Sequence, residues 1–392
     1  MLEILDLSGE SLAVLELSDE ESVKEQLQET LGWPRFRLRL VGELQSGCVQ
    51  LVILNFCPPD AEHDEAFLSR CEEGASEEVE KMLRRPQDPD TADAAGATGL
   101  HRAAEHGQEE VAKLLLSARA DVESAFEGAT ALHMASWQGY EAVARVLLEG
   151  KACVDARDSQ GFNALHWAVS YGESGVALVL VDAKADVTAP DAQGGTALHW
   201  CVTLGVGGED LLGMLLEARA DPKAADSQGK SALALATRFN HDALVRMLLH
   251  AAADVGAQDF DGVTALHLAS HQGCTTLVQT LLDAHADTRQ ADLHGCAALQ
   301  WACSGGHSSV VSMLLEAGAD RELNDALLLA VTAGHAAVVR ILLDASADAE
   351  WAASKGKTAL QSACQPSHVE VARMLLDARA DVGSVDSEQK SA

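Results

Sequence analysis

A polar–small–Leu–His pattern recurs along most of the chain and predicts a series of helix starts. In Thr264-Ala265-Leu266-His267 the hydroxyl group of the first residue can accept hydrogen bonds from the free N–H groups of a first helical turn, and the leucine can bury against a neighbouring helix. Read in one phase, nine units begin in this way, and eight of the nine starting residues are good helix caps. The starting residues are Thr98, Thr130, Asn163, Thr196, Ser231, Thr264, Ala297, Asp325 and Thr358.

A second pattern keeps the same phase: a Leu-Leu pair ends a helical segment, and Ala-Asp follows. From Asp221 to Asp254, Asp287 and Asp320 each step is 33 residues. Between the two patterns stands a Gly or Asn, such as Gly273, which indicates a turn between two helices. Each unit is therefore predicted to contain a short hairpin, a first helix, a turn and a second helix.

Together, T-x-L-H and the 33-residue period are the signature of ankyrin repeats, and residues 93–383 resemble an array of about nine such units. The resemblance implies a mostly α fold, an α-solenoid in which each unit packs on its neighbours. It also implies that the tetrad histidines hydrogen-bond the backbone of the preceding hairpin. Hairpin tips and the last turns of the first helices would line a concave protein-binding face.

The units depart from the family pattern at the helix end that precedes Ala-Asp. Ankyrin units usually have Gly there because the chain needs a positive φ, but only Gly318 has it in this sequence. Another residue at such a position costs about 1 kcal/mol. The residues found there are Arg119, Lys184, Arg219, Ala252, His285, Ser346 and Arg379.

Two units also depart in length. The fourth has two extra residues around positions 205–208, which lengthen the loop between its helices. Asp320 and Asp348 are 28 residues apart instead of 33, and the missing five fall in the hairpin of the eighth unit. We therefore expect a notch in the binding face at the eighth unit.

Residues 1–58 follow a different pattern: two apolar alternating segments, a helix over residues 20–31 and two further apolar segments. Gly32 and Pro34 end the helix. This ββαββ order resembles a small α+β ubiquitin-like β-grasp domain. The connection after Leu40 is short for that family and the Gly-Gly end is missing, so conjugation to a target is not expected. An unrelated small α+β cap is the open alternative.

Residues 59–92 are predicted to be a linker and an N-terminal capping helix pair, with helices over residues 65–73 and 76–83 separated by Gly74. The outer face of this pair is acidic, as the end of a solenoid requires. Residues 384–392 repeat the start of a unit and are interpreted as a truncated tenth repeat or a tail; a frayed or partner-covered end is the alternative. The inward side chains of the pair are Phe67, Leu68, Val79, Met82 and Leu83.

Charge and cysteine content indicate the cellular compartment of the protein and the class of partner it binds. The 28 basic and 60 acidic side chains give a net charge of −32, which argues against nucleic acid and favours basic protein partners or simple solubility. No apolar run reaches membrane length, so membrane insertion is not expected. The nine cysteines lack CxxC pairing, which indicates reduced thiols and a cytoplasmic protein, with the nucleus as the alternative. A monomer is expected.

No catalytic, cofactor or metal site is predicted. The tetrad histidines occur once per unit and so lie about 10 Å apart in stacked helices, too far to share a metal ion. Cys303 and His307 suggest a nucleophilic pair, but both occupy repeat positions, where packing is the favoured interpretation. Trp167, Trp200 and Trp301 directly follow the tetrad and are interpreted as core residues.

The positions that the repeat pattern leaves free hold six aromatic side chains in a chain with few of them. Exposed aromatic and arginine side chains are common anchors of protein interfaces, whereas packing between hairpins is the alternative. We predict a non-enzymatic scaffold or adaptor that binds other proteins; a regulatory or targeting segment of a larger enzyme or ubiquitin-pathway protein is the alternative. The predicted partner-binding residues are Phe126, Trp137, Phe162, Tyr171, Arg238, Phe239, Phe260 and His271.

Overall fold

The computed structural model describes four short strands near the N-terminus, and residues 61–84, 87–204, 208–351, 358–364 and 368–383. The chain divides into two units, Met1–Asp186 and Val187–Ala392, which are treated separately below as unit 1 and unit 2. None of the helices in the described residues is both long enough and apolar enough to cross a bilayer.

The N-terminal strands form two antiparallel pairs. β1 (Leu2–Leu5) pairs with β2 (Ser11–Leu15), and β3 (Leu38–Val41) pairs with β4 (Gln50–Ile53). Among the described strands these pairs are separate two-stranded sheets. The helix predicted over residues 20–31 lies outside the described residues, so the β-grasp assignment stays a prediction.

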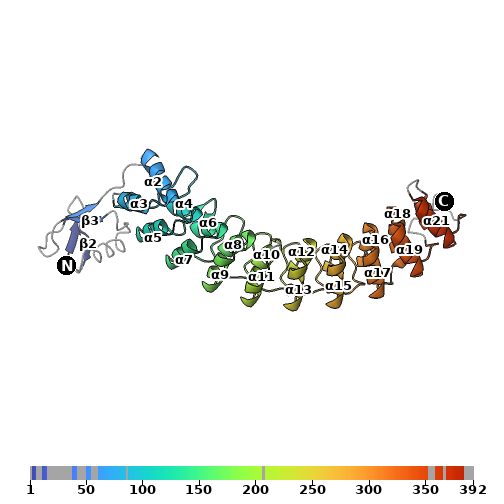
Figure 1. The fold of residues 1–392 in the computed structure, drawn as a ribbon. Helices are drawn as coiled ribbons and strands as arrows, with labels where there is room; N and C mark the ends of the chain where they lie inside the picture. The colour runs from blue at the N-terminus through green and yellow to red at the C-terminus, as the bar shows by residue number, and fades with distance from the viewer. Residues whose placement is uncertain are drawn as a thin grey trace. The chain divides into compact units, whose positions relative to one another are not determined.

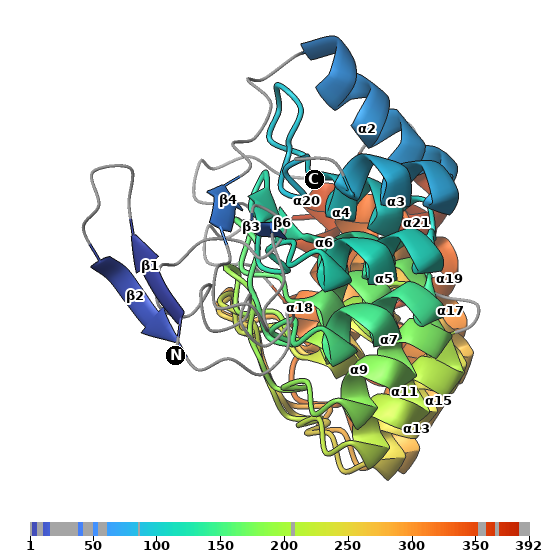
Figure 2. The same ribbon diagram turned by 90° about the vertical axis from the view of Figure 1, so that its left-hand side faces the viewer.

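The rest of unit 1 is a stack of antiparallel helix pairs (Figure 1). First helices pack on first helices and second helices on second helices, while the hairpins project on the side of the first helices (Figure 2). Its elements are α2 (Ala61–Glu73), α3 (Ser76–Leu83), α4 (Gly99–Glu105), α5 (Glu109–Ser117), β5 (Ala125–Phe126), β6 (Ala129–Thr130), α6 (Ala131–Gln138), α7 (Glu141–Glu149), α8 (Ala164–Tyr171) and α9 (Ser174–Asp182).

Unit 2 repeats the same packing, so the chain from residue 62 is a mostly α solenoid of about nine repeats. In both units the tetrad leucines, such as Leu132 and Leu266, are almost fully buried between successive first helices. The elements of unit 2 are α10 (Ala197–Cys201), α11 (Gly208–Glu217), α12 (Ala232–Arg238), α13 (Asp242–His250), α14 (Ala265–Gln272), α15 (Thr275–Asp283), α16 (Ala298–Gly305), α17 (Ser308–Glu316), α18 (Leu323–Ala333), α19 (Ala336–Asp344), α20 (Ala359–Ala363) and α21 (Val369–Asp377).

The first helix pair of unit 1 has the predicted capping arrangement. Phe67, Val79 and Leu83 are buried, and Met82 is half-buried. Because α2 packs on α4 and α3 on α5, the apolar side chains of the pair cover the open end of the first complete repeat. Salt bridges such as Arg70 to Glu78 (2.8 Å) lie on its exposed side.

The eighth repeat differs from the prediction in its helix start. Asp325 lies inside the first turn of α18, which begins at Leu323, so its assignment as the cap is wrong. The helix begins early because the hairpin is absent: only Arg321 and Glu322 separate Asp320 from α18. The predicted loss of this hairpin is therefore confirmed.

The left-handed helix ends are also confirmed. Arg119, Ala252 and Ser346 have φ values of 65°, 62° and 70°, in the region that favours glycine. Lys151 has φ 69° and joins this group, although it was not predicted. The full set of predicted positions with positive φ is Arg119, Lys184, Arg219, Ala252, His285, Ser346 and Arg379.

Candidate binding surface

The tetrad histidines connect neighbouring repeats and are not free for chemistry. The backbone N–H of Thr264 donates to Nδ1 of His267 (3.2 Å), so this nitrogen carries no proton. The proton is on Nε2, which lies 3.0 Å from the carbonyl oxygen of Cys296 in the next hairpin. The same pair of bonds occurs at His101, His133 and His199. The imidazole therefore bonds the end of its own hairpin, as the family resemblance implies. It also bonds the following hairpin, which the resemblance did not imply.

Burial keeps these rings neutral. Desolvation lowers the pKa of His101, His133, His199 and His267, because the charged form would lose its hydration. In the described parts of the chain there is no group of three or more His, Cys, Asp or Glu side chains placed to hold a metal ion. These histidines thus act as structural links between repeats.

Three tryptophans that follow the tetrads are anchored to hairpin carboxylates. The indole N–H of Trp301 donates to Asp292 (3.0 Å), and Trp167 and Trp200 make the same bond to Asp158 (2.9 Å) and Asp191 (2.8 Å). All three tryptophans are half-buried, so their assignment to the core is wrong in part. Each ring is therefore fixed to its hairpin and stays partly exposed.

The carboxylate of Asp292 is held by three donors. Burial alone would raise the pKa of Asp292, but hydrogen bonds from the Cys296 N–H, the Trp301 indole and the His294 N–H outweigh it and lower the pKa. Oδ1 of Asp292 accepts from the N–H groups of Cys296 (2.8 Å) and His294 (2.9 Å) and so orders the hairpin, while Oδ2 accepts from Trp301. Asp292 therefore fixes both the hairpin and the ring.

Asp292→Asn is expected to lower the free energy of unfolding by about 1–2 kcal/mol, because one side-chain oxygen becomes an N–H group that faces donors. Asp261→Asn, at an exposed hairpin tip, is the matched control and should change it by less than about 0.5 kcal/mol. Urea unfolding of both variants measures the difference. Equal stability of the two would contradict the assigned role of Asp292.

In unit 1 two of the predicted binding residues meet in an aromatic cluster. Trp137 and Tyr171 have ring centroids 5.9 Å apart, and both lie 6.1 Å from Trp167. Tyr171 is 54% exposed and the two tryptophans are half-buried. We call Trp137, Trp167 and Tyr171 the aromatic cluster; it forms where α6 ends next to α8.

The other two predicted residues of unit 1 pack against tetrad histidines. The ring of Phe126 lies edge-on to His101 (6.1 Å), and that of Phe162 stacks on His166 (5.5 Å). Both phenylalanines are half-buried. At these two positions the contacts fit the packing alternative as well as binding.

In unit 2 the predicted residues are more exposed and more separate. Phe260 is 72% exposed at a hairpin tip, and Phe239 is 46% exposed after α12, where its ring stacks on His241. Arg238 is exposed, and its carbonyl accepts a bond from Gln272 (2.6 Å).

The fourth predicted residue of unit 2, His271, contacts the Trp301 ring (5.5 Å) and lines a depression of about 280 Å³ beside it. This depression lies where α14 and α16 end, and its walls are largely apolar. Leu329 of α18 also lines it.

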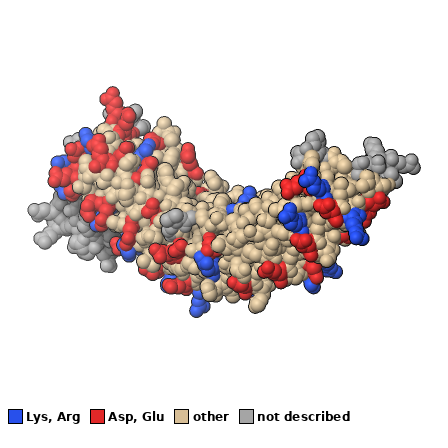
Figure 3. Space-filling view, turned by 45° about the vertical axis from the view of Figure 1, so that its right-hand side comes forward, with Lys and Arg blue, Asp and Glu red and all other residues tan. Residues whose placement is uncertain are grey.

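Acidic side chains gather on the N-terminal helices of unit 1 (Figure 3). A depression of about 720 Å³ between α2 and the first hairpin is lined by Asp64, Glu65, Glu72 and Asp93. Arg102 also lines it, and its guanidinium is engaged by Asp93 (2.7 Å). This depression is therefore suited to a cationic side chain.

The buried cysteines are unsuited to nucleophilic catalysis. Burial raises the pKa of Cys303 to about 12, so the thiol stays protonated at neutral pH. His307 does not activate it, since its Nε2 lies 2.8 Å from the carbonyl oxygen of His271. Cys71 and Cys201 have pKa values raised to about 12 by the same cause.

Stacked helix pairs with exposed hairpin tips define a repeat protein whose surface suits binding. The family model for ankyrin repeats (three copies) matches residues 67–158, 123–191, 153–226, 190–259, 233–325 and 320–386, and the chain belongs to the ankyrin-repeat family. Ankyrin repeats generally mediate protein–protein interactions and are typically non-catalytic.

A solved structure of the ankyrin repeat domain of Bcl-3, described as a unique member of the IkappaB protein family, is similar to this chain. The two are 30% identical with a TM-score of 0.51, and the match covers 56% of this chain and 99% of that one. No curated protein matches this chain.

Proposed function

We propose that this chain is a non-enzymatic adaptor that binds basic segments of partner proteins on its front face, meaning the hairpin tips and the last turns of the first helices. The aromatic cluster of unit 1 is the observation that carries this proposal. Tyr171 offers an open ring face, and Glu173 places its carboxylate over Gly139, close to Trp137. A Lys or Arg side chain can lie on such a ring while a carboxylate balances its charge.

The net charge supports the same kind of partner. With 60 acidic and 28 basic side chains, the protein attracts cationic segments over a distance of about a Debye length. In unit 2 the exposed Phe239 and Phe260 are proposed as further anchors, with Arg238 and His271 beside them. The proposal also includes a cytoplasmic location. In it, residues 1–58 form a ubiquitin-like segment that binds a second partner.

Affinity capture with the full chain tests the proposal. Partners retained by the wild type should be lost when Trp137→Ala or Tyr171→Ala is the bait. Each substitution should weaken the binding of a purified partner by about 2 kcal/mol. Phe239→Ala should do the same for partners that use unit 2.

Leu178→Ala is the matched control, because Leu178 is 48% exposed on the second helix α9, away from the front face. Melting curves verify that each bait is folded. If the front-face variants retain the same partners as Leu178→Ala, the binding surface is placed wrongly.

A further inference from the structure

The absent hairpin of the eighth repeat uncovers part of unit 2 that hairpins cover elsewhere. α18 begins at Leu323, three residues after Asp320, whereas α16 begins 11 residues after Asp287. Among the described residues, the hairpin over residues 287–297 therefore has a neighbouring hairpin on one side only.

Hairpin tips in unit 2 are otherwise joined by backbone hydrogen bonds. The N–H of Phe260 donates to the carbonyl of Gln228 (3.0 Å), and the N–H of Leu293 donates to that of Asp261 (2.8 Å). The next acceptor in this series is the carbonyl of His294. Within the described residues no backbone N–H donates to it, and Leu293 is 74% exposed. The series thus ends at an open edge.

The chain replaces only one of the lost contacts. Where other repeats have a tetrad histidine that donates to the next hairpin, the seventh repeat has Gln300, whose amide donates to the carboxylate of Glu322 (2.6 Å). Glu322 thereby supplies the oxygen that a hairpin carbonyl supplies elsewhere. Among the described residues we find no other side chain that replaces a contact of the absent hairpin.

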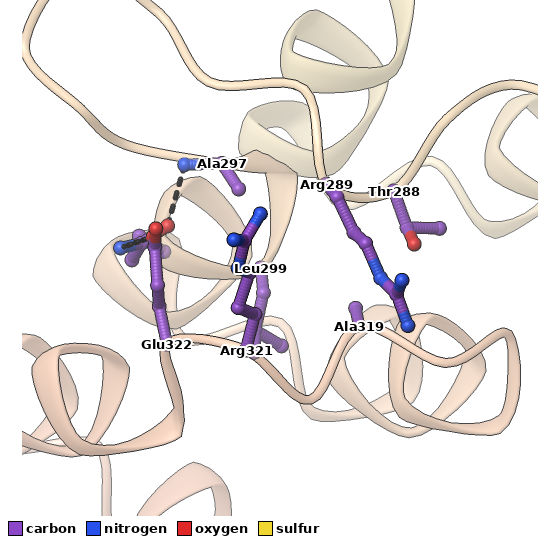
Figure 4. Close-up of a pocket in the computed structure, with 8 residues that line it drawn as sticks. Thr288, Arg289, Ala297, Leu299, Ala319, Arg321 and Glu322 are labelled. Atoms are coloured by element: carbon purple, nitrogen blue, oxygen red, sulfur yellow. Dashed lines mark hydrogen bonds between the residues drawn. The ribbon is translucent and has the colours of Figure 1, made fainter.

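Two depressions lie on this surface, one lined by arginines and one largely apolar, and we call them together the repeat-eight groove. Arg289 and Arg321 line one small depression of about 10 Å³ and enter it from two segments, and Glu322 lines it as well (Figure 4). Trp301 and Leu329 line the other depression, of about 280 Å³. The buried side chain of Gln300 lines both depressions and so lies between them.

Two carboxylates lie near the arginines of the groove, Asp320 and Glu322, and the Glu322 carboxylate accepts a hydrogen bond from Gln300. Arg289 has Asp320 at 3.8 Å, but both side chains are more than half exposed, so the pair is weak. Arg321 is exposed and forms no ion pair within the described part of the chain. In a protein of net charge −32, this part of the groove complements an acidic ligand.

We propose that the repeat-eight groove binds an extended segment of a partner protein that carries an apolar side chain beside a carboxylate. A backbone N–H of the segment donates to the carbonyl of His294 and continues the hydrogen-bond series. The apolar side chain lies between Trp301 and Leu329, and the carboxylate pairs with Arg321. This ligand is opposite in charge to the partner proposed for the aromatic cluster of unit 1.

The chain itself provides a probe of this chemistry. A fluorescein-labelled peptide of residues 254–264 contains the sixth hairpin, with Phe260 between the carboxylates of Asp259 and Asp261. Fluorescence anisotropy with the full chain should show saturable binding below about 1 mM, the affinity limit of a weak single-segment contact. A peptide with Asn in place of both Asp259 and Asp261 should bind at least about tenfold more weakly.

Protein variants locate the binding. Arg321→Glu and His271→Ala, both at exposed positions, should weaken the affinity for the peptide at least about tenfold. Arg340→Glu is a charge-matched control on the second helix α19, and Tyr171→Ala controls for the front face of unit 1; both should bind normally. Absence of saturable binding by the wild type, or equal binding by Arg321→Glu and Arg340→Glu, would overturn the proposal without affecting the proposed function.

Discussion

The protein is expected to lose stability between pH 6.5 and 5.5, and a variant with glutamine at His101, His133, His199 and His267 is expected to lose less. Burial lowers the pKa of these four rings in the folded state, whereas an unfolded histidine titrates near 6.5. Below pH 6.5 the unfolded chain therefore binds more protons than the folded one. The stability that is fully present above pH 6.5 falls by up to about 1 kcal/mol per histidine over this pH unit.

Between pH 6.5 and 5.5 the loss of stability from histidine protonation can be measured without a contribution from titrating carboxylates. Carboxylates with ordinary pKa values near 4 stay ionised throughout this range, so relief of their mutual repulsion does not mask the loss. Two of the four histidines lie in each unit, so each unit should lose about 2 kcal/mol.

Glutamine is a suitable replacement because the chain already uses it. The N–H of Thr358 donates to Oε1 of Gln361 (2.8 Å), in the same geometry as the Nδ1 bond of the tetrad histidines. Urea unfolding at pH 6.5 and 5.5 should show a smaller difference for the fourfold variant than for wild type. His294→Gln, at an exposed tip, is the control and should behave as wild type. Retention of the full acid sensitivity by the fourfold variant would refute the neutral-ring mechanism.

Features that depend on local sequence were predictable. The caps at Thr130 and Thr264 begin helices because their extended backbone and polar side chains suit the first turn. The length of the step from Asp320 to Asp348 was enough to predict the missing hairpin. The position of Asp325 was missed, because without a hairpin the helix starts at the first residues that can form it.

Features that depend on contacts between repeats were harder to predict. The tryptophans were assigned to the core by their position after the tetrad, but Trp167 bonds a carboxylate nine residues earlier and joins Trp137 and Tyr171 at the surface. An Asp nine residues before each Trp was the available signal. The link from Gln300 to Glu322 had no comparable signal, because it depends on how α18 packs after the hairpin is lost.

Glycine at the left-handed helix ends is expected to make unit 2 more stable by about 2–4 kcal/mol when four positions are changed together. Arg219, Ala252, His285 and Ser346 have φ values of 68°, 62°, 62° and 70°. A side chain with a Cβ atom is strained there, whereas glycine is not. Each change should contribute about 0.5–1 kcal/mol, because glycine also makes the unfolded chain more flexible and so offsets part of the gain. The positions are at least one repeat apart, so their effects should add.

Comparing single variants separates backbone strain from charge. Ala252→Gly removes strain alone, whereas Arg219→Gly also removes a cation near the carboxyl end of a helix, which stabilises by about 0.3–1 kcal/mol. Arg219→Gly should therefore stabilise less than Ala252→Gly. The reverse change, Gly318→Ala, should destabilise by about 1 kcal/mol through φ alone, since a Cβ atom there meets no atom within 4 Å at φ 86°. Urea unfolding measures all three, and a stabilised Gly318→Ala variant would show that these helix ends are not strained by their side chains.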